Sequence, residues 1–277
     1  QGLNAFPMPT AGTNRTLTAA AMYSLVLPAY AKKFGVDEDE LRMVVAKIAE
    51  KNHFNGARNP LAQFRREMSA EAICDMAAVA GKLSVFDCAG VADGAAAAIV
   101  VSAEKAYEYT DKPIFIKALS LVSGNGSGLI DPEYDYTTFP ECAAAAEDAY
   151  LQAGITNPRE ELALAEVHDC FTPTELILME DLKFSERGQG WKDVLDGNFA
   201  LNGPLPINTD GGLKSFGHPV GASGIRMHYE CWLQLRNEAP KERSIPQTER
   251  NLGLVHNLGG YPGEMVSFVS ILGTEID

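Results

Sequence analysis

The sequence predicts an α/β protein in which helices pack in layers against a sheet. Up to residue 80, apolar residues follow a helical period and strand signal is scarce. Beyond that point, short apolar runs typical of buried strands alternate with helical patterns. Reactive side chains follow several of these runs, which is where open α/β folds bind their ligands.

The first 80 residues predict a helical unit. Residues 16–35 indicate one helix with Pro28 near its middle. Residues 37–58 indicate a second helix, because its acidic start suits the helix dipole. Residues 59–76 predict a loop that leads into a short helix.

The remainder predicts a sheet with covering helices. The expected strands are 95–102, 112–124, 161–167 and a pair joined by a glycine-rich hairpin within 252–273. The expected helices are 140–155, 172–182 and 223–239. Strands and helices alternate, which supports the layered α/β class.

The charge of the chain is unevenly distributed. The formal net charge is −14, which argues against nucleic acid as a partner. Residues 1–72 hold nine Lys and Arg against seven Asp and Glu, a net +2 that leaves −16 for the rest. This segment could steer a small anionic ligand, although a solvated helical face would look the same. No apolar run approaches the roughly 20 residues that span a bilayer, so we expect no membrane partner.

The five cysteines are scattered and odd in number, which argues against a disulfide framework. They lie at positions 74, 88, 142, 170 and 231. Zinc would also use His and Cys, but the spacing of zinc motifs is missing. We therefore expect reduced thiols, no metal and a cytoplasmic protein.

The stretch "EVHDCF" places an imidazole, a carboxylate and a thiol where a predicted buried strand ends and a helix begins. In an extended backbone, His168 and Cys170 point to one side and Asp169 to the other. We therefore expect His168 and Cys170 to line one pocket while Asp169 faces the scaffold. A satisfied histidine and a small apolar cysteine are the structural alternative.

Two further histidines lie beside glycines. In "FGHPVGASG", Pro219 keeps the backbone of His218 out of the helical region, and such rigid placement suits a catalytic base or hydrogen-bond donor. His256 precedes "NLGGYPG", where Gly259 and Gly260 could offer backbone N–H groups to an oxyanion. A structural histidine and a simple hairpin turn are the respective alternatives.

Taken in order, "EVHDCF", "GGLKSFGHPVGASG" and "HNLGG" resemble the C-terminal part of a thiolase, in particular the sterol-carrier-protein-type and archaeal branch. "KNHFNGARNPLAQF" and "SVFDCAGVADGAAAAIVVS" resemble the thiolase loop domain and the strand after it. The resemblance implies a five-layered αβαβα thiolase fold of two similar halves. The chain then divides into a loop domain that binds coenzyme A (1–80), the end of the N-terminal half (81–112) and the C-terminal half (113–277).

The resemblance also implies roles for the candidate residues. His218 matches the "GHP" histidine, which activates a nucleophilic cysteine and helps to bind a thioester oxygen. His168 stands where common thiolases have the Asn of "NEAF", and would hold a water or an oxyanion. Cys170 resembles the second catalytic cysteine, which exchanges a proton with the α-carbon. His256 falls where common thiolases carry the "CxG" cysteine, and the glycines after it match the oxyanion loop.

Coenzyme A would explain the basic first segment, because it carries several phosphate charges. We expect Arg58, Arg65 and Arg66 to bind it, with acyl-CoA as substrate and no covalently bound cofactor. The nucleophilic cysteine should lie in an N-terminal half that precedes Gln1. The resemblance also implies a homodimer or dimer of dimers, and a small zinc-ribbon and OB-fold partner protein that accompanies many members of this branch.

Two other functions stay open. A thiolase-like aldolase would cleave a β-hydroxyacyl-CoA without a covalent intermediate; Tyr261 fits this reading and His218 argues against it. A non-catalytic scaffold subunit of an acyl-CoA-processing complex would need no nucleophile. It would also need none of His168, Cys170 and His218, which disfavours it.

Overall fold

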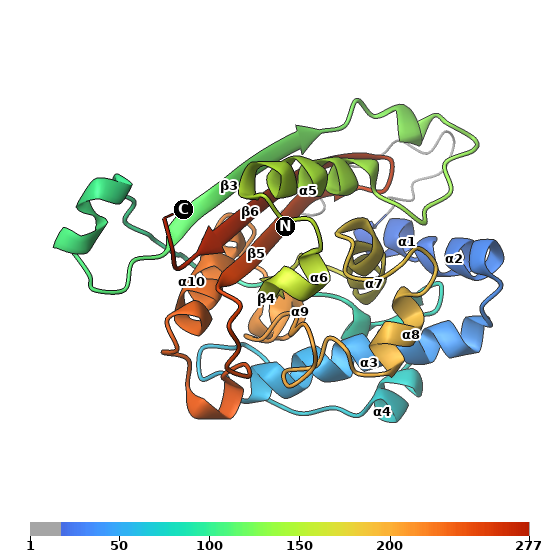
Figure 1. The fold of residues 1–277 in the computed structure, drawn as a ribbon. Helices are drawn as coiled ribbons and strands as arrows, with labels where there is room; N and C mark the ends of the chain where they lie inside the picture. The colour runs from blue at the N-terminus through green and yellow to red at the C-terminus, as the bar shows by residue number, and fades with distance from the viewer. Residues whose placement is uncertain (1–17, 277) are drawn as a thin grey trace.

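The computed structural model describes residues 18–276, so the start of the first predicted helix lies outside the described residues. A four-stranded mixed sheet in the order β3-β6-β5-β4 forms its frame (Figure 1). The strands are β3 (Phe115–Ser123), β4 (Leu162–Glu166), β5 (Leu252–Tyr261) and β6 (Glu264–Gly273). β5 and β6 form the predicted hairpin, β3 runs antiparallel to β6, and β4 runs parallel to β5.

Helices cover both faces of this sheet. α5 (Pro140–Ala153) packs on β3 and β6, whereas α10 (Ser223–Leu235) packs on β5 and β4 (Figure 1). On β6, the side chain of Ser267 lies beside Cys142 of α5, while the ring of its neighbour Phe268 lies 6.1 Å from that of His228 in α10. Because successive strand residues point to opposite faces, α5 and α10 lie on opposite sides of the sheet.

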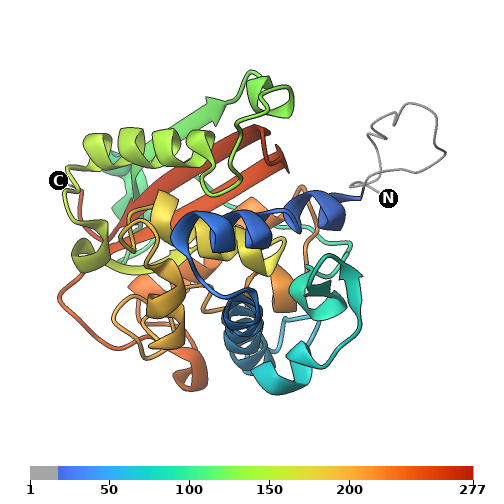
Figure 2. The same ribbon diagram turned by 90° about the vertical axis from the view of Figure 1, so that its right-hand side faces the viewer.

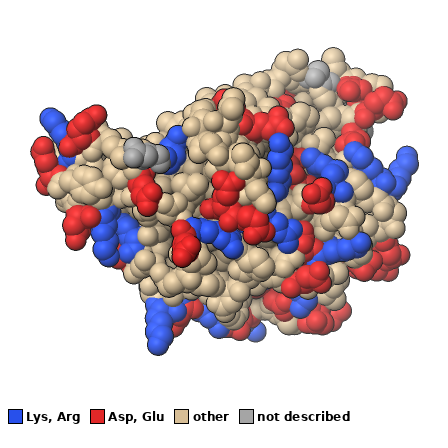
Figure 3. Space-filling model, viewed as in Figure 1, with Lys and Arg blue, Asp and Glu red and all other residues tan. Residues whose placement is uncertain are grey.

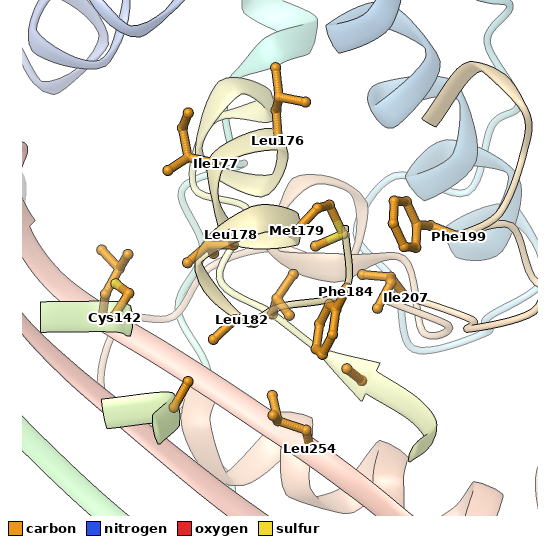
Figure 4. Packing of buried hydrophobic residues seen from close by; sticks show 14 of the residues in the cluster. Cys142, Leu176, Ile177, Leu178, Met179, Leu182, Phe184, Phe199, Ile207 and Leu254 are labelled. Atoms are coloured by element: carbon orange, nitrogen blue, oxygen red, sulfur yellow. The ribbon is translucent and has the colours of Figure 1, made fainter. Parts of the chain in front are cut away.

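The centre of the hydrophobic core is α7 (Thr172–Asp181). All ten residues of this helix are buried, and it packs against α2, α3, α5 and α8. Figure 4 shows Met179, Phe184 and Ile207 among the side chains of this buried cluster. A helix that is enclosed on every side fixes the position of the loop that precedes it, which is the "HDCF" loop.

Most of the N-terminal segment that the structure describes forms helices. Its helices are α1 (Ala19–Tyr23), α2 (Val26–Phe34), α3 (Glu38–Ala57) and α4 (Ala70–Cys74). They gather on one side of the molecule, where α2 and α3 contact α7 (Figure 2). Asp37 caps α3 by accepting hydrogen bonds from the backbone of Asp39 and Glu40, as its acidic start predicts.

The prediction of one continuous helix over 16–35 is wrong. The structure breaks it at Ser24 and Leu25, between α1 and α2. The ring of a proline clashes with the carbonyl four residues earlier, and that residue is Ser24 for Pro28. Pro28 therefore lies in the first turn of α2, where its missing N–H costs nothing.

The buried strand predicted over 95–102 is also wrong. The segment forms no strand, and Ile99 and Val100 are 90% and 74% exposed. A strand must pair its backbone N–H and C=O groups with a neighbour, and no described residue pairs with this segment. A small ribbon of β1 (Ala78–Ala80) and β2 (Leu83–Ser84) instead precedes it, and only β1 lies within the region 1–80 that was expected to be helical.

Short helices complete the described part of the chain, and the surface between them carries both charges. They are α6 (Pro158–Glu161), α8 (Gly190–Leu195) and α9 (Gly212–Phe216), with four 3-10 turns.

Acidic and basic side chains are interspersed over the face shown in Figure 3. Within residues 18–276, no helix combines the length and the apolar composition that a bilayer span requires.

Candidate active site

The "HDCF" loop begins where β4 ends and finishes where α7 begins. The backbone N–H of Val167 donates to Asn208 Oδ1 at 2.8 Å, which holds the start of the loop. The N–H of Ala89 donates to the carbonyl of Cys170, also at 2.8 Å, which holds its end. The loop thus occupies the carboxyl end of a parallel strand, as the sequence predicts.

His168 and His218 meet edge to face. Their ring centroids are 5.1 Å apart and their planes are nearly perpendicular, at 88°. The segment 88–91 joins the two loops, because Cys88 forms a bridge to Phe171 and Val91 forms a bridge to His218. The structure therefore brings together two of the three predicted histidines from loops 50 positions apart in the sequence.

The hydrogen bonds of His168 define which ring nitrogen carries the proton. Its Nδ1 contacts Asn257 Oδ1, and the same oxygen accepts a hydrogen bond from the N–H of Leu258 at 3.0 Å. The N–H of Leu258 also lies 3.5 Å from Nδ1, but its bond to Asn257 Oδ1 is shorter. Because an amide oxygen only accepts, the close contact with Asn257 places the ring proton on Nδ1. Nε2 of the neutral ring is then an acceptor.

His218 is oriented in the same way by a hydroxyl. Its Nδ1 lies 2.8 Å from Ser223 Oγ, and that hydroxyl donates to the carbonyl of Pro219 at 3.1 Å. A hydroxyl has one proton, so its oxygen accepts from Nδ1–H and leaves Nε2 unprotonated. Nε2 of His218 is thus available as a base.

Burial keeps both imidazoles neutral. It lowers the pKa of His168 well below the ordinary value, and the neighbouring His218 lowers it further. Burial also lowers the pKa of His218 to about 4. At neutral pH each ring therefore presents an unprotonated Nε2.

Asp169 faces the scaffold, as predicted from strand alternation. Its carboxylate accepts hydrogen bonds from the N–H groups of Leu213 (2.6 Å) and Lys214 (3.1 Å) and from Asn52 Nδ2 (2.7 Å). A Cβ at Gly212 would lie 2.4 Å from this carboxylate, so only glycine fits there. Asp169 thereby ties the "HDCF" loop to the loop that carries His218.

Cys170 is buried and protonated. Its Sγ lies 3.6 Å from Thr174 Oγ1. Burial raises the pKa of this thiol to about 12. At neutral pH, Cys170 is therefore a proton donor rather than a thiolate.

His256 is not brought together with the other two histidines. It is fully buried within β5, and its Nε2 lies 3.2 Å from Ser267 Oγ, on the sheet face covered by α5. Its neighbour Asn257, which contacts His168, points to the other face. This placement argues against direct contact between His256 and a substrate.

Gly259 and Gly260 lie near the exposed end of β5. Gly260 has φ +106°, and a Cβ there would lie 2.2 Å from the carbonyl oxygen of Glu264, so glycine is required. The hydroxyl of Tyr23 donates to the carbonyl of Gly260 at 3.2 Å. The glycine turn is therefore connected to Tyr23, whose ring stacks on Phe171 of the "HDCF" loop.

The three predicted arginines separate into two groups. Arg58 pairs with Glu67 at 2.7 Å and stacks over the ring of Phe54. Arg65 and Arg66 instead line a pocket of about 530 Å³. Of the three predicted arginines, only Arg65 and Arg66 therefore remain candidates to bind a ligand in that pocket.

Two further residues of this pocket region, His53 and Lys214, are not among the candidate residues predicted from the sequence. His53 lines the pocket; its Nδ1 lies 3.0 Å from the carbonyl of Arg66, and its buried Nε2 has no hydrogen-bond partner among residues 18–276. Lys214 is only 2% exposed, and its ammonium lies over the rings of Phe64 (5.6 Å) and Phe86 (5.7 Å), which also line the pocket. The one available signal was that both lie inside the quoted motifs, "KNHFNGARNP" and "GGLKSFGHP".

Comparison with known families identifies the class. Residues 126–274 match the model of the family described as thiolase C-terminal domain-like. This match covers more than half of the chain, which therefore belongs to the thiolase family. The resemblance drawn from the sequence motifs is confirmed, and so is the α/β thiolase fold.

Curated relatives agree with this assignment. The chain is 36% identical to acetyl-CoA acetyltransferase of Methanothermobacter thermautotrophicus, over 89% of this chain and 62% of that protein. It is 35% identical to human sterol carrier protein 2, over 77% of this chain and 39% of that protein. It is 31% identical to benzoylsuccinyl-CoA thiolase subunit BbsB of Thauera aromatica, over 86% of this chain and 59% of that subunit. The chain thus spans about three fifths or less of the length of these relatives.

Solved structures share the fold. The structure of an Ltp2-ChsH2(DUF35) aldolase has a TM-score of 0.77 at 24% identity, covering 96% of this chain and 65% of that one. A monomeric SCP2-thiolase like protein type 1 from Mycobacterium smegmatis has a TM-score of 0.64 at 18% identity, covering 94% of this chain and 52% of that one.

Proposed function

We propose that this chain supplies the acid/base groups and the coenzyme A site of a thiolase that makes or cleaves a β-ketoacyl-CoA by Claisen chemistry. The main evidence is the edge-to-face pair of His168 and His218, with Cys170 in the same loop as His168. The reaction needs an acid/base at an α-carbon and polar groups at two carbonyl oxygens. Two neutral imidazoles and a protonated thiol meet that need.

In the cleavage direction, a thiolate adds to the β-keto carbon and the bond between that carbon and the α-carbon breaks. The electron pair of the broken bond goes to the α-carbon, which takes the thiol proton of Cys170. His218 Nε2 takes the proton of the attacking thiol. His168 Nε2 accepts a hydrogen bond from a water molecule. The same water donates its second hydrogen bond to the thioester oxygen.

The attacking cysteine is proposed to be none of the five in this sequence. A nucleophilic cysteine needs a lowered pKa. Burial instead raises the pKa of all five thiols, to about 11 for Cys88 and about 12 for Cys170. This supports the expectation that the nucleophile belongs to the N-terminal thiolase half.

The pocket lined by Arg65 and Arg66 is proposed as part of the coenzyme A site. The two guanidinium groups suit phosphate groups, and the buried ammonium of Lys214, over the rings of Phe64 and Phe86, adds positive charge next to the pocket. Burial lowers the pKa of His53 to about 4, and its Nδ1 donates to a carbonyl. The Nε2 of this ring therefore requires an N–H or O–H donor, which the amide and adenine groups of coenzyme A can supply.

Replacing Arg65 and Arg66 together with Ala should raise the KM for coenzyme A by about tenfold or more, because charge-assisted hydrogen bonds are lost. The kcat should change little, because neither residue lies at the histidine pair. Arg58→Ala is the matched control, since Arg58 pairs with Glu67 and does not line the pocket. Equal effects of the control and of the double variant on KM would contradict this assignment.

A thiolase-like aldolase is the second candidate. It is favoured by the raised pKa of every thiol in the sequence, because an aldolase of this type needs no nucleophilic cysteine. One of the solved structures that share this fold is also named as an aldolase. This candidate predicts release of an aldehyde or ketone without coenzyme A.

We also propose that the protein works as a homodimer or dimer of dimers, together with a zinc-ribbon and OB-fold partner. The resemblance supports this proposal, and so does the structural neighbour whose name joins a DUF35 component to the aldolase. Light scattering of the full-length protein, alone and with a co-expressed partner, gives the oligomeric state directly.

The proposed thiolase function is tested by incubating the full-length protein with a β-ketoacyl-CoA and free coenzyme A. Mass spectrometry should find two acyl-CoA products for each β-ketoacyl-CoA consumed. Absence of this cleavage, both alone and with the partner protein, would overturn the proposal. Release of a carbonyl compound in the absence of coenzyme A would establish the aldolase instead.

A further inference from the structure

Gln63, near the end of the motif "KNHFNGARNPLAQF", bonds to two backbone segments that meet at His218. Its backbone N–H donates to the carbonyl of Phe216 at 2.9 Å, two residues before that histidine. Its side-chain Nε2 donates to the carbonyl of Val91 at a longer 3.4 Å. Because Val91 forms a parallel bridge to His218, Gln63 holds both sides of this bridge.

Two glycines make room for the carboxamide of Gln63 between these segments. A Cβ at Gly217 would lie 2.7 Å from Gln63 Oε1, and a Cβ at Gly90 would lie 2.9 Å from the same oxygen. Gly217 directly precedes His218, and the carbonyl of Gly90 accepts a hydrogen bond from the N–H of His218 at 2.8 Å. The carboxamide is therefore packed against the two backbone groups that hold this histidine.

The segment 88–91 also reaches the loop of the second histidine. The N–H of Ala89 donates to the carbonyl of Cys170 at 2.8 Å, so this segment is fixed to the "HDCF" loop. It therefore lies between the two loops that carry the histidine pair. Gln63 joins it to the loop of His218 from a third part of the chain.

We propose that Gln63 is a positioning residue that sets the spacing of the His168 and His218 rings. Its side chain is exposed, so the hydrophobic core does not depend on it. A carboxamide suits this place because its N–H donates to a carbonyl and it brings no charge near a neutral imidazole. The catalytic meaning of this inference rests on the proposed function, whose acid/base step needs both rings in a fixed geometry.

The spacing of the two rings can be measured whether or not the protein is a thiolase. In an edge-to-face pair, a carbon-bound proton of one imidazole points at the face of the other, and the ring current shifts its resonance upfield. We would record this resonance by NMR in the full-length protein labelled with ¹³C and ¹⁵N at histidine, and identify it by its change in His218→Ala. Gln63→Ala should move it downfield, because the two rings separate or tilt.

The matched control is Gln152→Ala. Gln152 is also exposed, and its carboxamide also bonds to backbone: it accepts from the N–H of Leu119 at 3.2 Å and donates to the carbonyl of Leu119 at 3.0 Å. Leu119 lies on β3, at the opposite edge of the sheet from β4 and the "HDCF" loop. This control should leave the resonance in place.

A second variant, Gln63→Glu, separates packing from hydrogen bonding. It keeps the atoms that contact Gly90 and Gly217, but it places a carboxylate oxygen where Nε2 donates to Val91. The resonance should move in the same direction as in Gln63→Ala. If either variant is folded by circular dichroism and keeps the wild-type resonance, the proposal is overturned.

Activity distinguishes this inference from the proposed function. In an active enzyme, kcat for β-ketoacyl-CoA cleavage should fall about threefold to tenfold in Gln63→Ala, the range that one ordinary hydrogen bond allows, and stay unchanged in Gln152→Ala. The thermal midpoint should fall no further than in that control. If the resonance moves but the wild type cleaves no β-ketoacyl-CoA, the positioning role stands and only the proposed function fails. If the resonance moves and kcat is unchanged, the catalytic meaning of the spacing is overturned.

Discussion

Two adjacent residues of β5 lie in very different surroundings. Asn257 points to the α10 side of the sheet, where it contacts His168 and fixes the protonated nitrogen of that ring. His256 points to the α5 side, where it is fully buried against Ser267 and its Nδ1 has no hydrogen-bond partner in the described part of the chain. One face of the strand therefore meets the pair of His168 and His218, while the other face belongs to the core.

The comparison teaches that a histidine beside a glycine turn is not thereby reactive. Burial alone lowers the pKa of His256 to about 3, which resembles the shift of His218. The difference lies in what surrounds each ring. His218 lies edge to face with a second imidazole, whereas His256 is enclosed in a β-sheet.

The largest effect is expected on the reactive face. His218→Ala should lower kcat/KM for β-ketoacyl-CoA cleavage by about 10²–10⁴, the usual contribution of a general base. The thermal midpoint should change little by comparison, and circular dichroism confirms that the variant is folded. Retention of near-wild-type cleavage by a folded His218→Ala protein would erase the proposed distinction between the two faces.

A smaller loss of cleavage activity should follow when the ring of His168 loses its hydrogen-bond partner Asn257. Asn257→Ala removes the acceptor at Nδ1, so the proton can move to Nε2 and the water can no longer be held as proposed. Groups that fix the orientation of functional histidines typically contribute about tenfold to a hundredfold. Asn257→Asp keeps an acceptor and should retain more activity than Asn257→Ala; the reverse order in steady-state assays would count against the tautomer argument.

The smallest effect on activity is expected for His256→Asn, which should change cleavage by less than about threefold while lowering the free energy of unfolding by about 1–3 kcal/mol. Steady-state assays and urea titrations measure the two quantities. A loss of activity comparable to that of His218→Ala would instead return His256 to the catalytic group.

The same variant should change how stability depends on pH. Burial lowers the pKa of His53 and His218 to about 4 and that of His256 to about 3, while unfolded histidine titrates near 6.5. Between these values the unfolded chain binds more protons, so the free energy of unfolding falls as pH is lowered from about 6.5 toward 4. In urea titrations, His256→Asn should make this decline shallower by up to about 1.4 kcal/mol per pH unit. An unchanged slope would mean that His256 is already protonated in the folded protein.

The sequence predicts most of the fold because each strand and helix carries a local signal. Apolar residues with a strand or helix period, and glycines at the ends of elements, predict three of these features. They are the hairpin of β5 and β6, the C-terminal end of α5 at Gly154 and the buried α7. The failures have long-range causes. Residues 95–102 read as a buried strand from composition, but a strand depends on a partner that no local pattern reveals.

The site was predictable where neighbouring residues define it. Alternation correctly separates Asp169 from its neighbours, and the motifs correctly unite His168 with His218. Tyr23 and Lys214 were missed because their roles depend on contacts with residues more than a hundred positions away. The role predicted for His256 rests on the glycines after it, which are as typical of a hairpin as of an oxyanion site, and it stays a prediction.

The central claim is that Cys170 is an acid/base thiol and that none of the five cysteines in this sequence is the nucleophile. The most direct measurement is to incubate the full-length protein with acyl-CoA in the absence of an acceptor and to locate the acyl group by peptide mass spectrometry. The account predicts a thioester on a cysteine other than these five, formed more slowly in His218→Ala. An acyl group on Cys170, or on any of the other four, would contradict it.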